Sequence, residues 1–438
     1  MHYRFIASIL FLALPLMAQQ SKPVSALSLT PVKPETVGFD SARLERLHTL
    51  MQSAVDRGQV HGVVTILARH GKVVDYKAYG WQDFDAKKPM ALDTIFRDYS
   101  MTKPVTGVAM LILYEQGKWL PSDPISKYIP EFKDLKVYAG TDAAGNMILA
   151  APDHAPTISE LMSHTAGFSY GFFGDTPVDK LYQQAKLFES HDLQEFIGRV
   201  AKIPLLYQPG HGWTYSVSMD IEGYLVEKLS GQSLPDFYRE HIYTPLGMRD
   251  AGFYVPDAKR ARFATNYSVD PKTGDLVTTP VPTAPMRDYA SQPTLPSGGG
   301  GQVSTAEDYY RFAQMLANGG QLDGKRILAP ATVRLMGSNH VPLELLDGKH
   351  GIGAQTLRPG FGYGYNCAVV YDPPTANLPE GKGTFFWDGA AGTWFWIDPT
   401  NDVVFVGMIQ RMGGAPTTEN LQYESRSVVY GALTDPAK

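Results

Sequence analysis

Ser100 and Lys103 have the residue types and the spacing needed for nucleophilic catalysis, and nowhere else in the chain does a Ser stand three residues before a Lys. A serine hydroxyl is a weak nucleophile, so it needs a neighbouring base to accept its proton as it attacks a carbonyl carbon. Residues three apart on a helix share a face, which would bring the amine of Lys103 to the hydroxyl of Ser100. The pair favours acyl transfer through a covalent serine intermediate. The alternative is a serine that caps a helix beside a solvated lysine.

The residues after Ser100 have the pattern of a buried helix. Pro104 falls in the first turn, where its missing N–H costs little, and segment 105–113 is largely apolar. Such a helix would direct the positive end of its dipole at Ser100. The dipole and a desolvated site would both disfavour the ammonium form of Lys103. More free amine would then be present to act as a base.

The residues around Ser100 and three downstream segments form a combination of motifs that is more specific than any one of them. In chain order these segments are Phe96-Arg97-Asp98-Tyr99-Ser100-Met101-Thr102-Lys103, Leu161-Met162-Ser163-His164-Thr165-Ala166-Gly167, Trp213-Thr214-Tyr215-Ser216-Val217 and Gly298-Gly299-Gly300-Gly301-Gln302-Val303-Ser304-Thr305-Ala306. Together they resemble the serine β-lactamase and penicillin-binding-protein superfamily (class C type), and most of all its family VIII carboxylesterases. The resemblance runs from about residue 37 to residue 432. It implies an α+β fold, in which an antiparallel sheet is flanked by helices and joined to a mainly helical inserted domain.

Tyr215 occupies the second motif of that family, a tyrosine at the start of a helix. The resemblance implies that Tyr215 shares a proton relay with Lys103 and later donates a proton to the leaving alcohol. A phenol near a lysine ammonium is expected to have a lowered pKa. Val217 stands where the β-lactamase pattern has an asparagine that binds the acyl-amide group of the substrate, and this weakens a β-lactamase interpretation. The same Tyr-Ser-Val triplet recurs at Tyr267, in a strand-like stretch, and is interpreted as structural.

The third family motif, Lys-Thr-Gly, has a literal copy at residues 272–274. Its neighbours Asp270, Pro271 and Asp275 are typical of a turn, so the copy is predicted to lie in a surface hairpin. The functional motif must instead lie on a core strand beside the nucleophile. By resemblance, residues 387–389 occupy that position, since they precede two apolar strand-like segments.

This assignment implies an oxyanion hole and a set of substrate contacts. The backbone N–H groups of Ser100 and Ala390 would bind the developing oxyanion. Replacement of the family's lysine and threonine by Trp387 and Asp388 removes a cation and favours uncharged substrates. The expected substrate contacts are Trp387, Asp388, Gly389 and Tyr170. Further aromatic residues either line an acyl or alcohol pocket or pack in the core: Phe172, Phe173, Phe361, Tyr363 and Trp394.

Residues 167–171 satisfy the Gly-x-Ser-x-Gly pattern of the α/β-hydrolases, with Ser169 at its centre. That motif must connect a strand to a helix. Here a capped helical start at residues 157–164 precedes it, so we interpret the glycines as a turn. With Lys103 available as a base, His164 is interpreted as a hydrogen-bonded structural residue in the same corner.

Composition is that of an ordinary globular enzyme. The chain has 438 residues, of which 44% are hydrophobic and 19% charged, and it can bury a large core. A net charge of -5 gives no electrostatic reason to expect nucleic acid or an anionic membrane as a partner. A single cysteine, Cys367, excludes an intramolecular disulfide, and the 11 histidines have no metal-ligand spacing. We expect no metal and no cofactor.

The N-terminus has the features of an export signal. His2 and Arg4 precede an apolar run, residues 5–17, that is too short for a comfortable membrane span and ends at Ala18. We predict a signal peptide at 1–18, a secreted or periplasmic location and no stable membrane insertion after cleavage. A polar leader is expected at 19–36.

The remaining pattern predicts one antiparallel sheet built from both ends of the chain. An amphipathic helix at 41–57 and a hairpin of strands at 63–68 and 73–79 precede Ser100, and four apolar strands follow residue 362. The predicted sheet domain comprises 37–109 and 294–438, and the mainly helical domain comprises 110–293. Ser100 and Tyr215 would lie where the two regions meet, which is where pockets form.

The motifs and the resemblance together predict a secreted serine hydrolase that cleaves carboxylic esters of short acyl chains through an acyl-enzyme at Ser100. A β-lactamase, a D-Ala-D-Ala carboxypeptidase or an amide hydrolase is the alternative enzyme. A non-catalytic binding protein of the same fold is a further alternative, which the joint presence of Ser100, Lys103 and Tyr215 disfavours. The sequence leaves the oligomeric state open.

Overall fold

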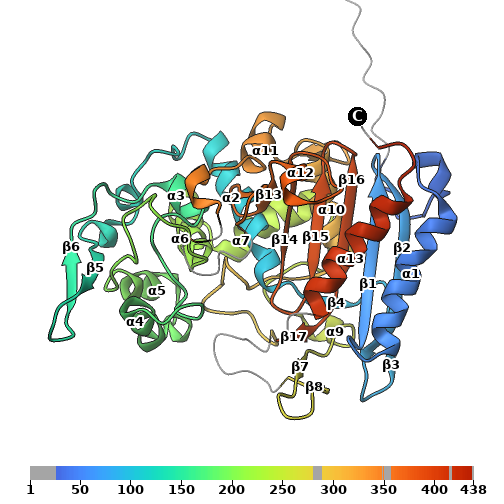
Figure 1. Ribbon diagram of the computed structural model, residues 1–438, viewed down its shortest axis with the longest axis horizontal. Helices are drawn as coiled ribbons and strands as arrows, with labels where there is room; N and C mark the ends of the chain where they lie inside the picture. Colours follow the sequence, from blue (N-terminus) through green and yellow to red (C-terminus); the bar gives the residue numbers. More distant parts are fainter. Residues whose placement is uncertain (1–25, 280–288, 348, 350–356, 414–416, 437–438) are drawn as a thin grey trace, which may run out of the picture.

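An eight-stranded antiparallel sheet forms the centre of the computed structural model, which describes residues 26–279, 289–347, 349, 357–413 and 417–436 (Figure 1). The strands follow the spatial order β12, β13, β14, β15, β16, β1, β2, β3. Their bounds are Phe361–Tyr363, Ala368–Val370, Thr384–Asp388, Trp394–Asp398, Val403–Met408, Gly62–Arg69, Lys72–Asp83 and Lys88–Pro89. The predicted sheet from both chain ends is confirmed, because β16 pairs with β1 in the register Leu67↔Phe405.

Alternation along each strand separates two hydrophobic layers. Trp394 and Trp396 of β15 pack in one layer with α1 (Ser41–Asp56) and α13 (Thr417–Ala432), whereas Phe395 and Ile397 face the layer that contains α2 (Thr102–Glu115) and α10 (Ala306–Ala317). Side chains of successive strand residues point to opposite faces, so a run buried on both faces is apolar throughout. Helices therefore cover the sheet on both sides (Figure 1).

The chain between α2 and α10 forms the helical part of the molecule. Figure 1 places α4, α5 and the β5–β6 hairpin away from the sheet, beyond α2 and α6, whereas α3 lies beside α6. The helices are α3 (Ile158–Met162), α4 (Pro177–Ala185), α5 (Leu193–Val200), α6 (Ser218–Ser230), α7 (Leu234–Tyr238), α8 (Thr244–Leu246) and α9 (Asp257–Arg260). The predicted domain boundary at residue 110 falls inside α2, and the division into two domains stays a prediction.

Short strand pairs and helices complete the fold around this frame. The additional strands are β4 (Ile95–Arg97) with β9 (Val303–Thr305), β5 (Val137–Thr141) with β6 (Met147–Ala150), β7 (Tyr267–Val269) with β8 (Leu276–Thr278) and β17 (Arg411–Met412), and β10 (Gln321–Leu322) with β11 (Lys325–Arg326). Two further helices are α11 (Pro330–Met336) and α12 (Pro373–Ala376). Pairing of β4 with β9 brings the strand before Ser100 beside the glycine run at 298–301.

That glycine run is a tight backbone passage. A Cβ atom at Gly298 would lie 2.3 Å from the carbonyl oxygen of Met219, and one at Gly299 would lie 2.7 Å from a carboxyl oxygen of Asp220. Both distances are far below van der Waals contact, so a side chain would push the run away from α6. Glycine at 298 and 299 allows this backbone to pass directly beside the site residues described below.

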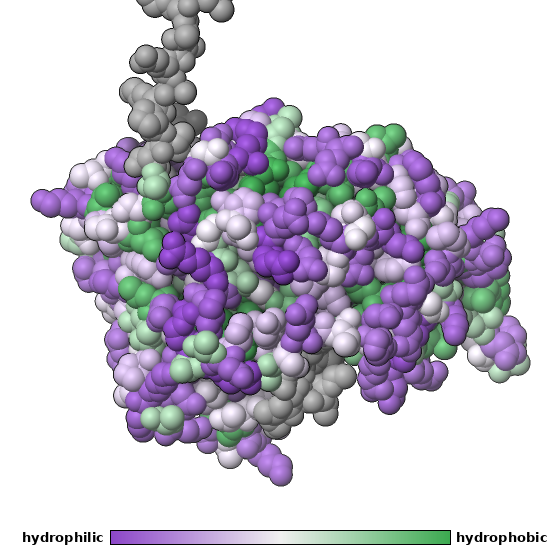
Figure 2. Space-filling model, turned by 180° about the vertical axis from the view of Figure 1, so that it is seen from behind, coloured by the Kyte–Doolittle hydropathy of each residue, from purple (hydrophilic) through white to green (hydrophobic). Residues whose placement is uncertain are grey.

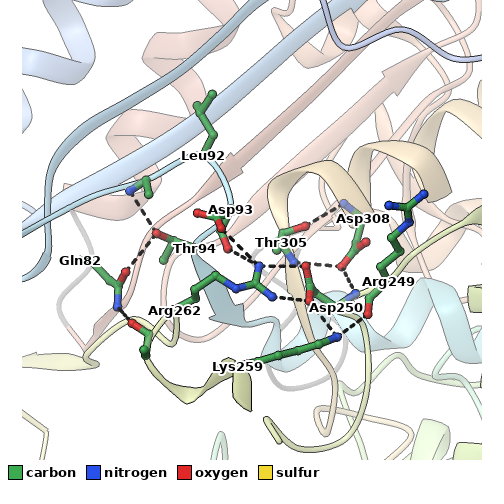
Figure 3. A network of polar contacts seen from close by, with 12 residues as sticks. Gln82, Leu92, Asp93, Thr94, Arg249, Asp250, Lys259, Arg262, Thr305 and Asp308 are labelled. Atoms are coloured by element: carbon green, nitrogen blue, oxygen red, sulfur yellow. Dashed lines mark hydrogen bonds and ion pairs between the residues drawn. The ribbon is translucent and has the colours of Figure 1, made fainter. Parts of the chain in front are cut away.

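A polar network anchors the start of α10, just after the glycine run (Figure 3). Arg262 donates two hydrogen bonds to the carboxylate of Asp250, and the amine of Lys259 lies 2.9 Å from the same group. The backbone N–H of Asp250 donates to Asp308 (3.1 Å), whose own N–H donates to the capping hydroxyl of Thr305 (3.1 Å). Segment 249–262 is thereby tied to the amino end of α10.

The surface and the N-terminus bear on the location of the protein. On the face opposite that of Figure 1, hydrophilic side chains cover most of the surface and hydrophobic patches lie between them (Figure 2). None of the helices formed by the described residues has the length and apolar character that crossing a membrane requires.

The predicted signal peptide, 1–18, lies outside the described residues. The later part of the leader runs beside β2, where the N–H of Val32 donates to the carbonyl of Val73 (2.8 Å).

Candidate active site

Ser100 lies in a short 3₁₀ turn, Tyr99–Met101, immediately before α2. The preceding Tyr99 adopts a left-handed backbone conformation (φ 45°), which is unusual for a bulky residue. Asp98 supports this turn, because its carboxyl group accepts hydrogen bonds from Gln302 (2.6 Å) and Ser304 (2.7 Å). Ser100 is only partly buried, so its hydroxyl stands at the amino end of a buried helix where a substrate can approach, as predicted.

Lys103 is almost completely buried one turn further along α2, with 1% of its surface exposed. Its Nζ atom lies 3.3 Å from Oγ of Ser100, 3.0 Å from the hydroxyl of Tyr170 and 2.6 Å from the carbonyl oxygen of Gly299. Burial lowers the pKa of Lys103 to about 7, against the opposing charges of three carboxyl groups. A neutral amine can donate to Gly299 and Tyr170 and keep its lone pair for the proton of Ser100.

Two of the three carboxyl groups that act on Lys103 are buried on α6. Asp220 accepts hydrogen bonds from the hydroxyl of Ser297 (2.5 Å) and from the N–H of Gly299 (3.2 Å). Glu222 is completely buried, and burial raises its pKa to about 8. The third, Asp388, is exposed at the end of β14. Negative charge on these groups favours the ammonium form of Lys103. It therefore limits how far burial can lower the pKa of the amine.

Asn366 links Glu222 to the nucleophile helix. Its amide nitrogen donates to a carboxyl oxygen of Glu222 (2.6 Å) and to the backbone carbonyl of Lys103 (3.1 Å). Sequence reasoning did not identify Asp220, Glu222 or Asn366 as part of this site. The two acidic residues interrupt the largely apolar run that follows Tyr215. This interruption was the only feature of the sequence that could have indicated their place in the site.

Tyr215 covers Lys103 just before α6, with Nζ 4.6 Å from the ring centroid. Burial raises the pKa of Tyr215, and the opposing interactions with Ser100 and Trp387 do not compensate. The expected lowering of this pKa is therefore wrong. A buried phenol has lost the water that stabilises a phenolate, and this cost exceeds the attraction of a lysine that is itself easily neutralised. Tyr215 consequently stays protonated where Lys103 is already a free amine.

A pocket of about 340 Å³ opens over these groups and is lined by Ser100, Tyr215 and Ala390 among others. Ala390 follows β14, is exposed and lines the same pocket as Ser100, as the predicted oxyanion hole requires. Tyr170, expected as a substrate contact, also lines the pocket and in addition binds Lys103. Among the described residues that line the pocket, none carries a formal charge.

Residues 387–389 do not line this pocket. Trp387 is buried behind Tyr215, with ring centroids 5.5 Å apart, and Asp388 points from the exposed end of β14. Gly389 packs against the turn before Ser100, where an added Cβ would lie 2.3 Å from the carbonyl oxygen of Asp98. Trp387 and Gly389 thus contact residues of the site, Tyr215 and Asp98. Direct contact of residues 387–389 with substrate stays a prediction. Three of the other aromatic candidates are core residues: Phe361, Tyr363 and Trp394.

Ser169 and His164 occupy the structural positions that the sequence indicated. The hydroxyl of Ser169 is buried and donates to Asp179 (2.6 Å), which fits a structural role. His164 is buried after α3, with Nδ1 2.9 Å from the hydroxyl of Ser216 and its ring 4.9 Å from that of Tyr215. Burial holds the pKa of His164 well below its usual range. It is a neutral packing partner of Tyr215.

The copies of family motifs at 267–269 and 272–274 are also structural. Tyr267 belongs to β7, and residues 272–274 form the exposed turn that joins β7 to β8, with the N–H of Gly274 donating to Asp270 (2.8 Å). Val217 is completely buried in the core before α6. It offers no polar group to a substrate.

No metal-binding arrangement is present in the part of the chain that the structure describes, where no group of three or more His, Cys, Asp or Glu side chains is placed to hold an ion. One oxygen of each buried carboxyl group on α6 accepts hydrogen bonds from the side-chain or backbone donors named above. Cys367 is buried, and its thiol lies near the carbonyl oxygen of Met336.

The titration of Lys103 gives the site a specific pH dependence. Because the amine must be neutral to accept a proton from Ser100, kcat/KM for an uncharged ester is expected to rise through a limb near pH 7 and then level off. The raised pKa of Tyr215 predicts that no descending limb follows from this phenol at moderately alkaline pH. The measurement is a pH profile of kcat/KM, corrected for spontaneous hydrolysis.

Asp388→Asn is the matched control for this profile. The charge of Asp388 raises the pKa of Lys103, so its removal is expected to move the limb to lower pH without abolishing turnover. A profile that falls with rising pH would contradict the assignment of Lys103 as the base.

Comparison with known proteins places this chain in a family. A family model described as Beta-lactamase matches residues 47–429. The chain belongs to the beta-lactamase family. Protein Rv1367c of Mycobacterium tuberculosis is 36% identical over 364 residues, which are 82% of this chain and 88% of that protein. Esterase EstB of Burkholderia gladioli is 32% identical over 389 residues, 84% of this chain and 91% of the esterase.

Solved structures of the family have the same fold. EstCE1, a hydrolase with promiscuous acyltransferase activity, aligns with a TM-score of 0.73 at 28% identity, over 89% of this chain and 99% of its own. The resemblance inferred from the motifs and the α+β β-lactamase-type fold are thereby confirmed. These beta-lactamase-family relatives include esterases and acyltransferases, and they support a hydrolase.

Proposed function

We propose that this beta-lactamase-family protein is a secreted serine hydrolase that cleaves carboxylic esters through an acyl-enzyme at Ser100. The observation that carries the proposal is the contact between Lys103 and Ser100, in which a fully buried amine with a pKa of about 7 lies 3.3 Å from the nucleophile. A serine beside an amine that is neutral near physiological pH has the base that nucleophilic catalysis needs. The esterase relative EstB supports the choice of esters.

Acylation begins when Oγ of Ser100 attacks the ester carbonyl carbon. The Ser100 proton passes to Nζ of Lys103, and the carbonyl oxygen becomes an oxyanion held by the N–H groups of Ser100 and Ala390. Collapse of this intermediate breaks the bond to the alcohol oxygen. Tyr215 donates its phenol proton to that oxygen and recovers a proton from Lys103, so the alcohol leaves neutral and the amine is free again.

Deacylation repeats these steps with water as the nucleophile. The Lys103–Tyr215 pair takes one proton from the water as its oxygen attacks the acyl carbon, and the same oxyanion hole holds the second tetrahedral intermediate. Cleavage of the bond to Ser100 then releases the carboxylic acid, and the relay returns a proton to Oγ. The raised pKa of Tyr215 suits a group that donates and regains a proton but does not stay ionised.

Two features favour esters over β-lactams. Val217 is buried and has no amide to bind the acyl-amide group of a lactam. Trp387 and Asp388 replace the lysine and threonine that would bind a lactam carboxylate, and the exposed Asp388 adds a negative charge nearby. β-Lactam, D-Ala-D-Ala peptide and amide hydrolysis are therefore the less favoured enzymatic alternatives.

Acyl transfer is the second candidate activity. An acyl-enzyme in a pocket lined by uncharged residues can react with an alcohol in place of water, which reverses acylation with a different alcohol. The acyltransferase activity in the description of EstCE1 favours this candidate. Export of the protein stays a proposal that rests on the N-terminal sequence.

Covalent labelling tests the proposal directly. The mature protein is assayed with p-nitrophenyl butyrate and with nitrocefin, then treated with a phosphonate ester, and the labelled peptide is mapped by mass spectrometry. We expect the ester to be turned over much faster than the lactam and the label to lie on Ser100. A preference for nitrocefin would make the protein a lactamase, and absence of both label and turnover would favour a binding protein of the same fold.

A further inference from the structure

A group of partly exposed aromatic side chains continues the catalytic pocket outward. We define Phe172, Phe173 and Phe188 as the aromatic rim; all three line the pocket that contains Ser100. Phe172 and Phe173 are 57% and 52% exposed, although each is a large apolar side chain. Phe188 is half-buried behind Tyr170, with ring centroids 6.3 Å apart.

The rings of the rim form a connected series that reaches the catalytic tyrosine. Phe173 contacts Tyr215 with ring centroids 5.8 Å apart, and Phe172 stacks on Tyr170 at 5.7 Å. Single exposed hydrophobic residues are common on protein surfaces, but a contiguous group beside a reactive centre marks a binding surface. Aromatic faces at these distances bind another apolar or aromatic group well, because burial removes their exposed area from water.

The residues that line the catalytic pocket around the rim carry no formal charge. A smaller hollow of about 140 Å³ shares Tyr170, Phe172 and Phe188 with the pocket. Its two charged residues, Lys186 and Glu189, pair with each other at 3.2 Å. An apolar substituent can therefore extend from the reaction centre across the rim without meeting an unpaired charge in the lining of either cavity.

The contact between Phe173 and Tyr215 indicates which part of an ester substrate binds to the rim. In the proposed reaction Tyr215 delivers a proton to the leaving alcohol oxygen, so the carbon chain of the alcohol lies beside the Tyr215 ring. Phe173 packs on that same ring. The oxyanion hole at Ala390 belongs to the carbonyl oxygen and lies after β14, a separate element.

We propose that the aromatic rim binds the alcohol part of the substrate, and that the preferred substrates are uncharged esters of alcohols that carry an aryl or similarly bulky apolar group. This inference rests on the proposed ester hydrolysis and adds the class of alcohol. Phe173 is the residue of the rim that determines specificity most, because it contacts both Tyr215 and Phe172.

Two substrate pairs test the proposal in the full-length mature protein. The alcohol pair is 2-phenylethyl butyrate and ethyl butyrate, whose alcohols have closely similar acidity, and the acyl pair is ethyl 3-phenylpropanoate and ethyl propanoate. Phe173→Ala is expected to lower the phenylethyl-to-ethyl ratio of kcat/KM by about tenfold, since a contact of one aromatic ring is lost. The ratio for the acyl pair is expected to stay unchanged.

Phe84→Ala is the matched control, because Phe84 is also an exposed aromatic residue (36%) but stacks on His61 away from the pocket. Both ratios should stay at the wild-type value in this variant. A fall in the acyl ratio in place of the alcohol ratio would overturn the assignment of the rim to the alcohol. Unchanged ratios in Phe173→Ala would overturn the rim as a binding surface.

A binding measurement separates failure of this inference from failure of the proposed function. The alcohol product, 2-phenylethanol, is titrated by NMR into Ser100→Ala and into Ser100→Ala combined with Phe173→Ala. We expect the second protein to bind it about tenfold more weakly. Equal binding would overturn the inference even if esters are cleaved, whereas absent cleavage of p-nitrophenyl butyrate would overturn the proposed function.

Discussion

Ser100→Ala is expected to lower kcat/KM for p-nitrophenyl butyrate by about 10⁴-fold or more, because no other oxygen nucleophile can form the acyl-enzyme. The change removes one partly buried oxygen in the turn before α2 and leaves the pocket lining otherwise intact. We therefore expect near-wild-type thermal stability together with loss of the phosphonate label. Steady-state kinetics and intact-mass spectrometry measure these two outcomes.

Ser169→Ala is the control for this prediction. Ser169 satisfies the Gly-x-Ser-x-Gly pattern, but its hydroxyl donates to Asp179 at 2.6 Å and accepts from the N–H of Gly171 at 3.0 Å. Its loss is expected to lower stability and to leave turnover largely intact. If Ser169→Ala were inactive and Ser100→Ala active, the assignment of the nucleophile would be wrong.

Lys103→Met is expected to lower kcat/KM by about 10³-fold or more, because methionine fills a similar volume but cannot accept a proton. The measurement is made across the pH range, and the limb near pH 7 should disappear with the amine. Loss of Nζ also leaves the carbonyl of Gly299 and the hydroxyl of Tyr170 without their donor, so some loss of stability is expected.

Lys103→Arg distinguishes a base from a positive charge. A guanidinium keeps the charge but cannot be deprotonated in a protein, so this variant should be as inactive as Lys103→Met. Tyr215→Phe is expected to cost on the order of a hundredfold, less than either change at Lys103. Greater activity in Lys103→Met than in Tyr215→Phe would mean that the tyrosine is the principal base.

Several parts of this site could be predicted from the sequence because they depend on spacing along one element. Ser100 and Lys103 are neighbours on a helix face wherever that helix forms, and an apolar run after them predicts the helix. Turn residues around 272–274 and the capped helix before Ser169 excluded two motif copies for the same local reason. Alternating and continuous apolar strands at both chain ends predicted the sheet.

The pKa values of the relay could not be predicted in this way. The expectation for Tyr215 considered its neighbour Lys103 but not the burial of the Lys103 amine and of the Tyr215 hydroxyl. Burial depends on residues from distant segments, such as Trp387 of β14, which packs on the Tyr215 ring. Desolvation acts on every ionisable group in the site at once, so it lowers the pKa of the lysine and raises that of the phenol.

The sequence alone therefore determined which residues can react and in which order they occur, since those properties follow from residue type and local spacing. The tertiary structure decided what surrounds them. Asn366, Glu222 and Gly299 come from three separate segments, and each contacts Lys103 or its hydrogen-bonded partners only after the sheet and α6 have packed on α2. A contact between distant segments depends on how whole elements pack, and no spacing within one element records it.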